Sequence, residues 1–310
     1  MIDINPVKLL CSKRGNVVDE EYFGFVLLFE NSSLIKKYGD DNCALFYLRS
    51  LSKPVQASLI QDFNAVEKLN LTQEEVAICC GSHSGTNKHV SLVDSILNKA
   101  GLDECQLLCP PATPLDTKDF DGNKKPIYHN CSAKHALMLA LSKLNGWSLN
   151  NYTDVNHPLQ KLIYERHIEL SGALKAEISY DGCGTPVFAL RVNEIARMFF
   201  NLFANYPFIL NAMVNNPYVM GGFDRLDSEI IQLGEKNLAA KVGAGGFLLV
   251  YNIKEDKILI VKMSQNNNLP RRIVALNVLY KLGWIKQNPA PAHFCNDLGQ
   301  IVGDYVCFVI

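Results

Sequence analysis

The chain has 310 residues, of which 48% are hydrophobic and 20% are charged, and its formal net charge is −1. This composition is typical of a globular protein with a substantial core, and it excludes a disordered chain. Because no excess of basic residues is present, nucleic acid is not expected as a partner.

The first fifty residues are expected to form strands. The runs YFGFVLLFE (22–30) and CALFYLR (43–49) are apolar and rich in aromatic residues, and NSSL (31–34) between them is typical of a turn that leads into KYGD (37–40). The opening MIDINPVKLL has no charged segment followed by an apolar run, so we expect no signal peptide and a cytoplasmic protein.

The middle of the chain, about residues 50–233, is expected to be mostly helical. Thr72 and Glu75 have the spacing of a capping box, and Asn156 is a candidate N-cap for a helix that ends at Gly172. The most hydrophobic stretch, residues 196–214, is interrupted by Arg197 and by other polar residues and a proline, so no membrane span and no membrane partner are expected.

After Ala239 the pattern changes to apolar, β-branched runs. KVGAGGFLLVYN (241–252) and KILIVKM (257–263) predict a hairpin, and RRIVALNVLYKLGW (271–284) predicts a helix. The sheet therefore comes from both chain ends. We predict an α+β fold in one domain with two lobes, a sheet lobe of about 1–49 plus 235–310 and a mainly helical lobe of about 50–234, with a cleft where they meet.

Ten cysteines are present, but they do not resemble a disulfide framework. Cys79 and Cys80 are adjacent, and several others lie in apolar segments. We expect reduced thiols, as in the cytoplasm.

The stretch LRSLSKPVQA (48–57) contains a candidate catalytic pair. Residues three apart on a helix share a face and neighbours do not, so Ser50 is expected beside Lys53, and Ser52 is expected to point away. A neutral lysine amine can activate a serine hydroxyl as a general base. The triplet S-x-x-K is also frequent on solvated helices, so the pair depends on the other motifs.

Two further segments carry polar groups that could enter a cleft. CCGSHSGTNKHV (79–90) contains Ser82, His83 and Ser84, and Lys241 begins a buried strand followed by Gly243. The order of S-x-x-K, a hydroxyl-bearing loop and K-x-G on a strand is similar to that of serine β-lactamases and penicillin-binding proteins. Alternatively, Ser82 and Ser84 cap the following helix, and Lys241 is solvated.

Taken together, the motifs resemble those of the L-asparaginase II family (class 3). The matching pieces are Arg49-Ser50-x-x-Lys53-Pro54, Ser82-His83-Ser84, Asn130-Cys131-Ser132-x-Lys134-His135, Asp181-Gly182-Cys183 and Lys241-x-Gly243-Ala244. The resemblance implies a serine β-lactamase-like fold, hydrolysis of L-asparagine to aspartate and ammonia, and a homodimer.

The resemblance also implies roles for individual residues. It implies catalytic pairs of Ser50 with Lys53 and of Ser82 with Lys241, with Ser50 as the expected nucleophile. It implies zinc, modulating rather than performing the chemistry, held by Cys131, Lys134 and Cys183 with Asp181 nearby. The expected substrate contacts are Arg49, His83, Asn130, Gly243 and Ala244.

Each assignment has an alternative interpretation. Cys131 and Cys183 could be packing residues, as the other eight cysteines are expected to be, and His83, His89 and His135 are expected to be hydrogen-bonded structural residues rather than general bases. The competing functions are a β-lactamase, a glutaminase of the same fold, and a non-catalytic module that binds an amino acid or zinc. One methylene in the substrate is worth only about 1–3 kcal/mol, so asparagine and glutamine stay open.

Overall fold

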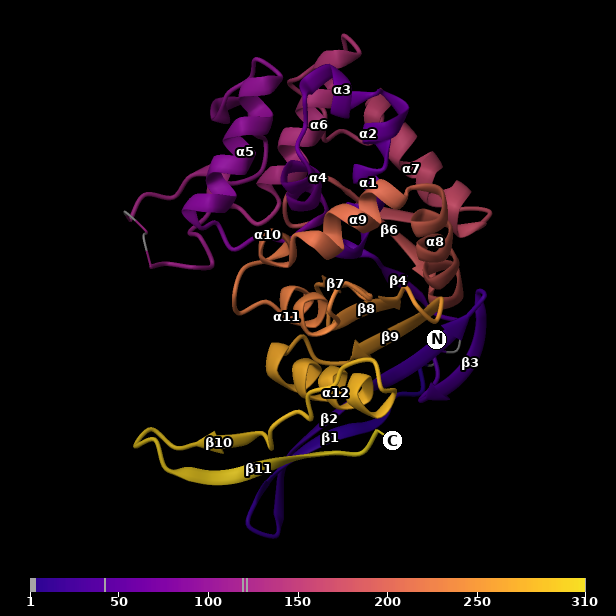
Figure 1. Cartoon of the computed structure of the whole chain (residues 1–310), viewed down its shortest axis with the longest axis vertical. Coiled ribbons are helices and arrows are strands. Elements are labelled where there is room, and N and C mark those ends of the chain that lie inside the picture. The colour runs from indigo at the N-terminus through magenta and orange to yellow at the C-terminus, as the bar shows by residue number, and fades with distance from the viewer. Residues whose placement is uncertain (1–3, 42, 119, 121, 310) are drawn as a thin grey trace. The chain divides into compact units, whose positions relative to one another are not determined.

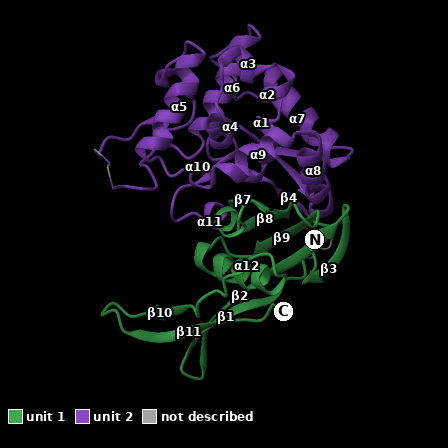
Figure 2. Cartoon of the chain, viewed as in Figure 1, with its two compact units in different colours: residues 1–44, 230–310 green, residues 45–229 purple. Residues whose placement is uncertain are grey.

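The computed structural model describes residues 4–41, 43–118, 120 and 122–309. The chain divides into two compact units, which we call the sheet unit (1–44 and 230–310) and the helical unit (45–229) (Figure 2). The prediction that they are two lobes of one domain stays a prediction.

The sheet unit is built on one large antiparallel sheet. Its strands are β1 (Val7–Arg14), β2 (Val17–Glu30), β3 (Ser33–Tyr38), β7 (Leu238–Gly243), β8 (Phe247–Asn252), β9 (Lys257–Met263), β10 (His293–Cys295) and β11 (Ile301–Cys307). They lie in the order β10-β11-β1-β2-β9-β8-β7, and β3 also pairs with β2 (Figure 1). Helix α12 (Asn268–Lys281) packs against β9, β1 and β11.

The pairing of β2 with β9 joins the two ends of the chain. Leu27 lies opposite Ile260, and both are almost completely buried. Apolar side chains on these central strands and on α12 form the core of the sheet unit, because each strand is long and rich in β-branched or aromatic residues. The predicted α+β class, with an antiparallel sheet made by both chain ends, is confirmed.

The helical unit contains a small sheet surrounded by helices. Its strands, in the order β4-β6-β5, are β4 (Leu45–Tyr47), β5 (Glu177–Tyr180) and β6 (Pro186–Arg191). Its helices are η1 (Arg49–Ser52), α1 (Lys53–Ala57), α2 (Leu59–Asp62), α3 (Ala65–Leu69), α4 (Gln73–Cys80), α5 (Asn87–Lys99), η2 (Glu104–Gln106), η3 (Pro126–Tyr128), α6 (Ser132–Leu144), α7 (Pro158–Ser171), α8 (Val192–Asn205), α9 (Pro207–Asn215) and α10 (Pro217–Met220). Helix α11 (Leu226–Leu233) crosses from this unit to the sheet unit.

Most local predictions are confirmed. Asn31 and Ser32 have positive φ angles of 46° and 63°, as a two-residue hairpin turn between β2 and β3 requires. The capping box of Thr72 and Glu75 is present at the start of α4. Gly172 ends α7 with a φ of 64°.

Two boundary predictions are wrong. The side chain that caps α7 belongs to His157, which accepts from Leu159 N, rather than to Asn156, because Pro158 fixes the first helical position one residue later. The run CALFYLR gives only the three-residue strand β4, and this strand pairs with β6 in the helical unit rather than with the large sheet.

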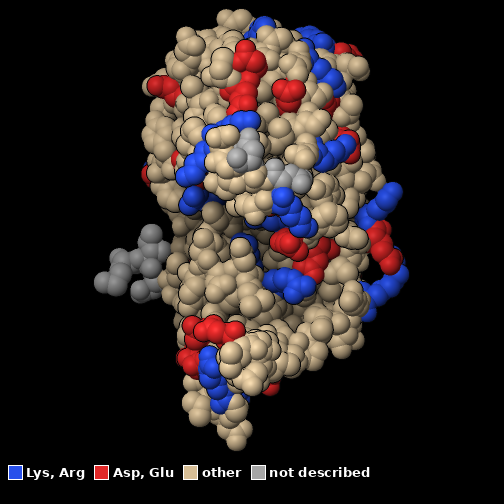
Figure 3. Space-filling model, turned by 90° about the vertical axis from the view of Figure 1, so that its left-hand side faces the viewer, with Lys and Arg blue, Asp and Glu red and all other residues tan. Residues whose placement is uncertain are grey.

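The ten cysteines are all free thiols, as expected. The interpretation of the other eight as packing residues is wrong for Cys43, Cys105 and Cys295, which are exposed. Within the described residues, no helix is long and apolar enough to cross a membrane. On the face drawn in Figure 3, basic and acidic side chains lie next to one another, in keeping with the formal net charge of −1.

Candidate active site

The centre of the candidate site is the side-chain nitrogen of Lys53, which is buried inside the helical unit. Lys53 Nζ makes three hydrogen bonds, to the carbonyl oxygens of Gly81 and Asn130 at 2.8 Å each and to Ser82 Oγ at 3.0 Å. These partners come from the end of α4, the start of the following loop and the segment before α6. The motifs around residues 50, 80 and 130 are therefore brought together around one lysine.

The three partners of Lys53 can accommodate both protonation states of the side chain. A carbonyl oxygen only accepts hydrogen bonds, so Gly81 and Asn130 take two N–H groups of Lys53. In the neutral amine the remaining lone pair faces Ser82 Oγ, and in the ammonium form the third N–H does. Burial is the main cause that lowers the pKa of Lys53 below its ordinary value of 10.5, and the positive charge of Lys134 acts in the same direction. Burial therefore shifts Lys53 toward the neutral amine relative to a lysine in water.

Ser50 lies at a strained turn immediately before α1. Arg49 has a φ of 50°, a left-handed conformation that is uncommon for residues other than glycine and that occurs at functional sites. The turn is held because Leu48 N donates to Phe188 O and Lys53 N donates to Ser50 O. Ser50 is half-buried, and no hydrogen bond within the described residues joins its hydroxyl to Lys53 Nζ. Pairing of Ser50 with Lys53 stays a prediction.

Ser52 belongs to a different contact, as the sequence predicted. Its hydroxyl lies against Nε2 of His167 on α7, and His167 Nδ1 donates to Ile163 O at 2.7 Å. Both side chains are buried, so this pair fixes α1 against α7.

The loop after α4 is anchored by His83. His83 Nδ1 accepts from Gly85 N at 3.2 Å, and the other ring nitrogen is 2.9 Å from Ser132 Oγ, which donates to Ile127 O. Burial lowers the pKa of His83 well below its ordinary value, so the ring is neutral. The ring is buried and both nitrogens have partners, so the interpretation of His83 as structural fits this arrangement, and its expected contact with substrate stays a prediction.

The serines of this loop do not cap the following helix. The N-cap of α5 is Thr86, whose hydroxyl accepts from His89 N. Ser84 Oγ donates to Gly221 O at 2.6 Å, and Ser82 is the partner of Lys53. The capping interpretation of Ser82 and Ser84 is wrong.

Beside Lys53 lie the side chains that were expected to hold zinc. Cys131 Sγ donates to Asn130 Oδ1 at 3.2 Å, and Cys183 Sγ lies 3.3 Å from Thr185 Oγ1. Interaction between the two thiols lowers the pKa of Cys183, as the positive charge of Lys134 also does, and it raises the pKa of Cys131, as burial also does. Lys134 Nζ donates to Thr185 Oγ1 at 2.7 Å. His135 Nε2 is buried without a hydrogen-bond partner among the described residues.

This donor set is compatible with a thiophilic metal. Two adjoining thiols, one of which favours the thiolate, are ligands that zinc prefers. Burial lowers the pKa of Lys134, but the charges of Cys183, Cys131 and Asp181 outweigh it and raise that pKa above 10.5, so Lys134 would have to lose its proton to bind a metal. In the described part of the chain, no group of three or more His, Cys, Asp or Glu side chains is arranged to hold a metal ion. The expected zinc ligands Cys131, Lys134 and Cys183 stay a prediction.

Asp181 is turned toward the start of α1. Its Oδ1 accepts from Arg49 Nε at 2.5 Å and from Gly182 N at 2.8 Å. Because Asp181 is largely buried, the pair holds the strained turn at Arg49 against the loop that carries Cys183.

The remaining expected residues belong to the sheet unit. Lys241 lies on β7 and is completely buried, so the alternative of a solvated lysine is wrong. Its Nζ donates to Val242 O at 2.9 Å. Gly243 O accepts from Arg271 Nη1 at 3.0 Å, and Ala244 follows in the β7–β8 turn.

The sequence profile of L-asparaginase II matches residues 11–301, which is nearly the whole chain. The chain belongs to the L-asparaginase II family. Membership of this family indicates a hydrolase with a small-molecule substrate. A comparison with curated protein sequences gives no match.

The chain is similar to solved structures with which this member of the L-asparaginase II family shares little sequence. A β-lactamase from Mycobacterium bovis is 13% identical with a TM-score of 0.46, and the alignment covers 83% of this chain and 94% of that one. A peptidoglycan synthesis regulatory factor from Streptococcus pneumoniae is 13% identical with a TM-score of 0.43, and the alignment covers 84% and 78% of the two chains.

Sequence reasoning missed three groups that complete the site of this L-asparaginase II family member. The carbonyls of Gly81 and Asn130 are backbone groups, which no side-chain motif reveals. Thr185, which binds Lys134 and lies 3.3 Å from the Cys183 sulfur, stands two residues after Cys183, and this spacing was a usable signal.

Proposed function

We propose that the protein is an L-asparaginase that hydrolyses the side-chain amide of L-asparagine to aspartate and ammonia. The observation that carries the proposal is the position of Lys53 Nζ between two carbonyl oxygens and Ser82 Oγ, in a chain of the L-asparaginase II family. Two fixed acceptors consume the N–H groups of a neutral amine and leave its lone pair for a hydroxyl proton.

In the proposed reaction, Ser50 is the nucleophile. Its hydroxyl attacks the carboxamide carbon, and its proton passes to the neutral amine of Lys53, whose lone pair must turn from Ser82 toward Ser50 for this step. Collapse of the tetrahedral intermediate releases ammonia, which takes a proton that Lys53 delivers through Ser82 Oγ. The 3.0 Å contact of Lys53 with Ser82 supports the second transfer. Water then hydrolyses the acyl-enzyme and frees Ser50. In this scheme Lys241 assists Ser82.

Zinc is proposed as a modulating cofactor bound by Cys131, Cys183 and Lys134. Bound there, the metal would supply a positive charge that favours an anionic group of the substrate. The protein's own residues hold this region in place, because Thr185 orients Lys134 and the ion pair of Asp181 with Arg49 orients the neighbouring loop.

We also propose that the protein is a cytoplasmic homodimer, from the family resemblance and from its ten free thiols. Light scattering coupled to size exclusion measures the dimer directly, and a monomer at working concentrations would contradict it.

The test is ammonia release from L-asparagine and L-glutamine, measured side by side. We expect turnover of asparagine by the wild type. Ser50→Ala and Lys53→Met should each lower kcat by about 10⁴-fold or more, because removing either member of a nucleophile–base pair removes the function of both. Ser148→Ala is the matched control, since Ser148 lies outside the site, and it is expected to retain full activity.

The same assay separates the alternatives. Ser82→Ala is expected to lower kcat without abolishing formation of the acyl-enzyme, which intact mass spectrometry detects as a mass increase on Ser50. Faster release from glutamine would make the protein a glutaminase, and turnover of nitrocefin would favour a β-lactamase. Release from neither amide by a zinc-supplied, folded protein would refute the proposed function.

A further inference from the structure

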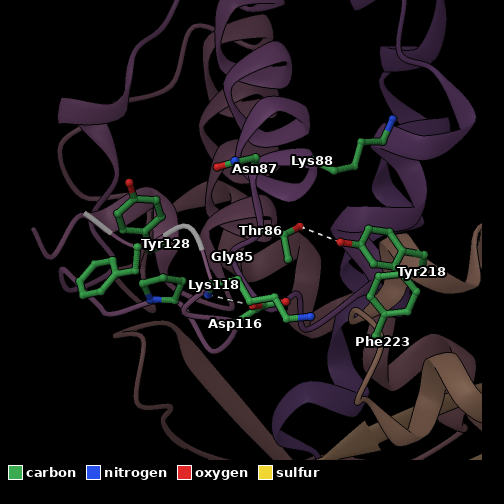
Figure 4. A pocket seen from close by; sticks show the side chains of 11 residues that line it. Gly85, Thr86, Asn87, Lys88, Asp116, Lys118, Tyr128, Tyr218 and Phe223 are labelled. Atoms are coloured by element: carbon green, nitrogen blue, oxygen red, sulfur yellow. Dashed lines mark hydrogen bonds between the residues drawn. The ribbon is translucent and has the colours of Figure 1, made fainter. Parts of the chain in front are cut away.

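A second cavity lies in the helical unit, next to the start of α5. Its volume is about 230 Å³, and its walls include Thr86, Asp116, Lys118, Tyr128, Tyr218 and Phe223 (Figure 4). None of the residues that surround Lys53 Nζ lines it. The function proposed above does not use this cavity, so an explanation for it must come from its own chemistry.

The cavity contains opposite charges that do not neutralise each other. Asp116 and Lys118 both line it, yet among the described residues no ion pair joins the carboxylate of Asp116 to the ammonium of Lys118. The carboxylate instead accepts from the backbone N–H of Lys118 at 3.1 Å, which fixes its position. A second lysine, Lys88, is engaged elsewhere, because its Nζ pairs with Glu74 at 2.6 Å.

Aromatic rings form the other walls. Tyr218 and Phe223 lie together, with ring centroids 4.9 Å apart, and Figure 4 shows them on one side of the cavity and Tyr128 on the other. Tyr218 is held in place because its hydroxyl donates to Thr86 Oγ1 at 3.1 Å and its ring stacks on His89 with an angle of 11°. Phe223 is 78% exposed, so much of its ring surface beyond the contact with Tyr218 is open to a ligand.

From these features we infer that this cavity binds a free α-amino acid with an aromatic side chain. The carboxylate of Asp116 would receive the α-ammonium group, Lys118 would receive the α-carboxylate, and the rings of Tyr128, Tyr218 and Phe223 would enclose the side chain. A zwitterion pairs with both charges at once. A simple anion would be repelled by the carboxylate of Asp116, and a simple cation would be repelled by the ammonium group of Lys118. Offset and edge-to-face contacts between rings add about 0.5–1.5 kcal/mol per pair.

The size of the cavity agrees with such a ligand. Sites for drug-sized molecules have volumes of about 300–1,000 Å³, so a cavity of about 230 Å³ suits a molecule with one ring. The inference rests on the cavity alone and holds whether or not the protein is an asparaginase.

The experiment is isothermal titration of the full chain with L-phenylalanine. We expect saturable binding of one molecule per chain. N-acetyl-L-phenylalanine, which lacks the ammonium charge, and 2-phenylethylamine, which lacks the carboxylate, are each expected to bind about tenfold more weakly or worse, because each loses a charge-assisted hydrogen bond.

Surface variants locate the binding. Asp116→Asn, Lys118→Gln and Phe223→Ala are each expected to weaken binding about tenfold, because each removes one charge or one ring. Lys124→Gln is the matched control, since Lys124 is exposed on the same loop and does not line the cavity, and it is expected to bind as the wild type does.

Lys53→Met separates this cavity from the proposed active site and is expected to bind phenylalanine normally. Absence of saturable binding at millimolar concentration, binding unchanged in Asp116→Asn and Lys118→Gln, or binding lost in Lys53→Met would each overturn the inference.

Discussion

Gly81 is the position where a single methyl group should damage both the fold and the site. A Cβ atom added there would lie 2.4 Å from Met220 O, 3.0 Å from Met220 C and 3.1 Å from Met220 Cα. The obstacle is backbone, and real Cβ contacts are not found below 3.0 Å, so either Met220 or Gly81 must move. Movement of either backbone would disturb a hydrogen bond, because Ser82 N donates to Met220 O at 2.9 Å and Gly81 O accepts from Lys53 Nζ.

The expected cost of Gly81→Ala follows from these contacts. Inserting a methyl group into a packed region costs about 1–3 kcal/mol, and weakening one buried hydrogen bond adds about 1 kcal/mol. The free energy of unfolding should therefore fall by about 2–4 kcal/mol. Since the carbonyl that holds Lys53 must also shift, and a displacement of about 1 Å near reacting groups can cost about 100-fold, kcat/KM for asparagine should fall by a similar factor.

Urea unfolding followed by circular dichroism measures the first effect, and ammonia release measures the second. Gly182→Ala is the control for stability, because a Cβ at Gly182 would meet no atom within 4 Å and its φ is not in the left-handed region. We expect that variant to stay within about 0.5 kcal/mol of the wild type. A Gly81→Ala protein as stable and as active as the wild type would refute the argument from close approach.

Three further variants test other parts of the molecule. Burial raises the pKa of Glu75, but hydrogen bonds from Lys99 and neighbouring groups outweigh it and hold the pKa below the ordinary 4.5. Glu75→Gln should therefore lower the free energy of unfolding at pH 7 by about 2–4 kcal/mol. In urea unfolding, the difference from the wild type should shrink as the pH falls through the native pKa of Glu75, which is below 4.5. A difference that persists at low pH would contradict this. Cys183→Ser should lower zinc content, measured by atomic absorption after dialysis, about tenfold or more, and undiminished zinc would exclude Cys183 as a ligand. Arg271→Lys should destabilise the β7–β8 hairpin by about 1–3 kcal/mol. The reason is that a lysine cannot reproduce the two hydrogen bonds from Arg271 Nη1 to Gly243 O and Phe247 O. Hydrogen exchange of the hairpin amides should become faster, and an unchanged exchange rate would argue against this role of Arg271.

Local patterns in the sequence predicted the structure best. The capping box at Thr72 and the left-handed end of α7 at Gly172 depend on a few neighbouring residues, so spacing alone reveals them. The partner of β4 could not be predicted, because a three-residue strand carries too little pattern to select a sheet.

In the candidate site, too, local motifs could be predicted from the sequence, and contacts between distant segments could not. The motifs led to Lys53 and Ser82, and the structure places their side chains 3.0 Å apart. Sequence could not show that two carbonyls hold the lysine, nor that Asp181 pairs with Arg49, because these contacts join segments as many as 132 residues apart. The prediction of a substrate contact for His83 came from its place in the motif, which gives no information about burial.

The arrangement of the large sheet has a consequence for how the protein is made. Strands β1, β2 and β3 are synthesised first, but β2 pairs with β9 and β1 pairs with β11, and Glu30 finds its partner only at Lys257. During synthesis, the apolar edges of β1 and β2 therefore stay unpaired until the ribosome has released most of the chain, including β9 and β11. Such distant pairing slows folding and exposes the nascent chain to aggregation. Yield in a heterologous host should therefore depend more on growth temperature and chaperone supply than on the chemistry of the site.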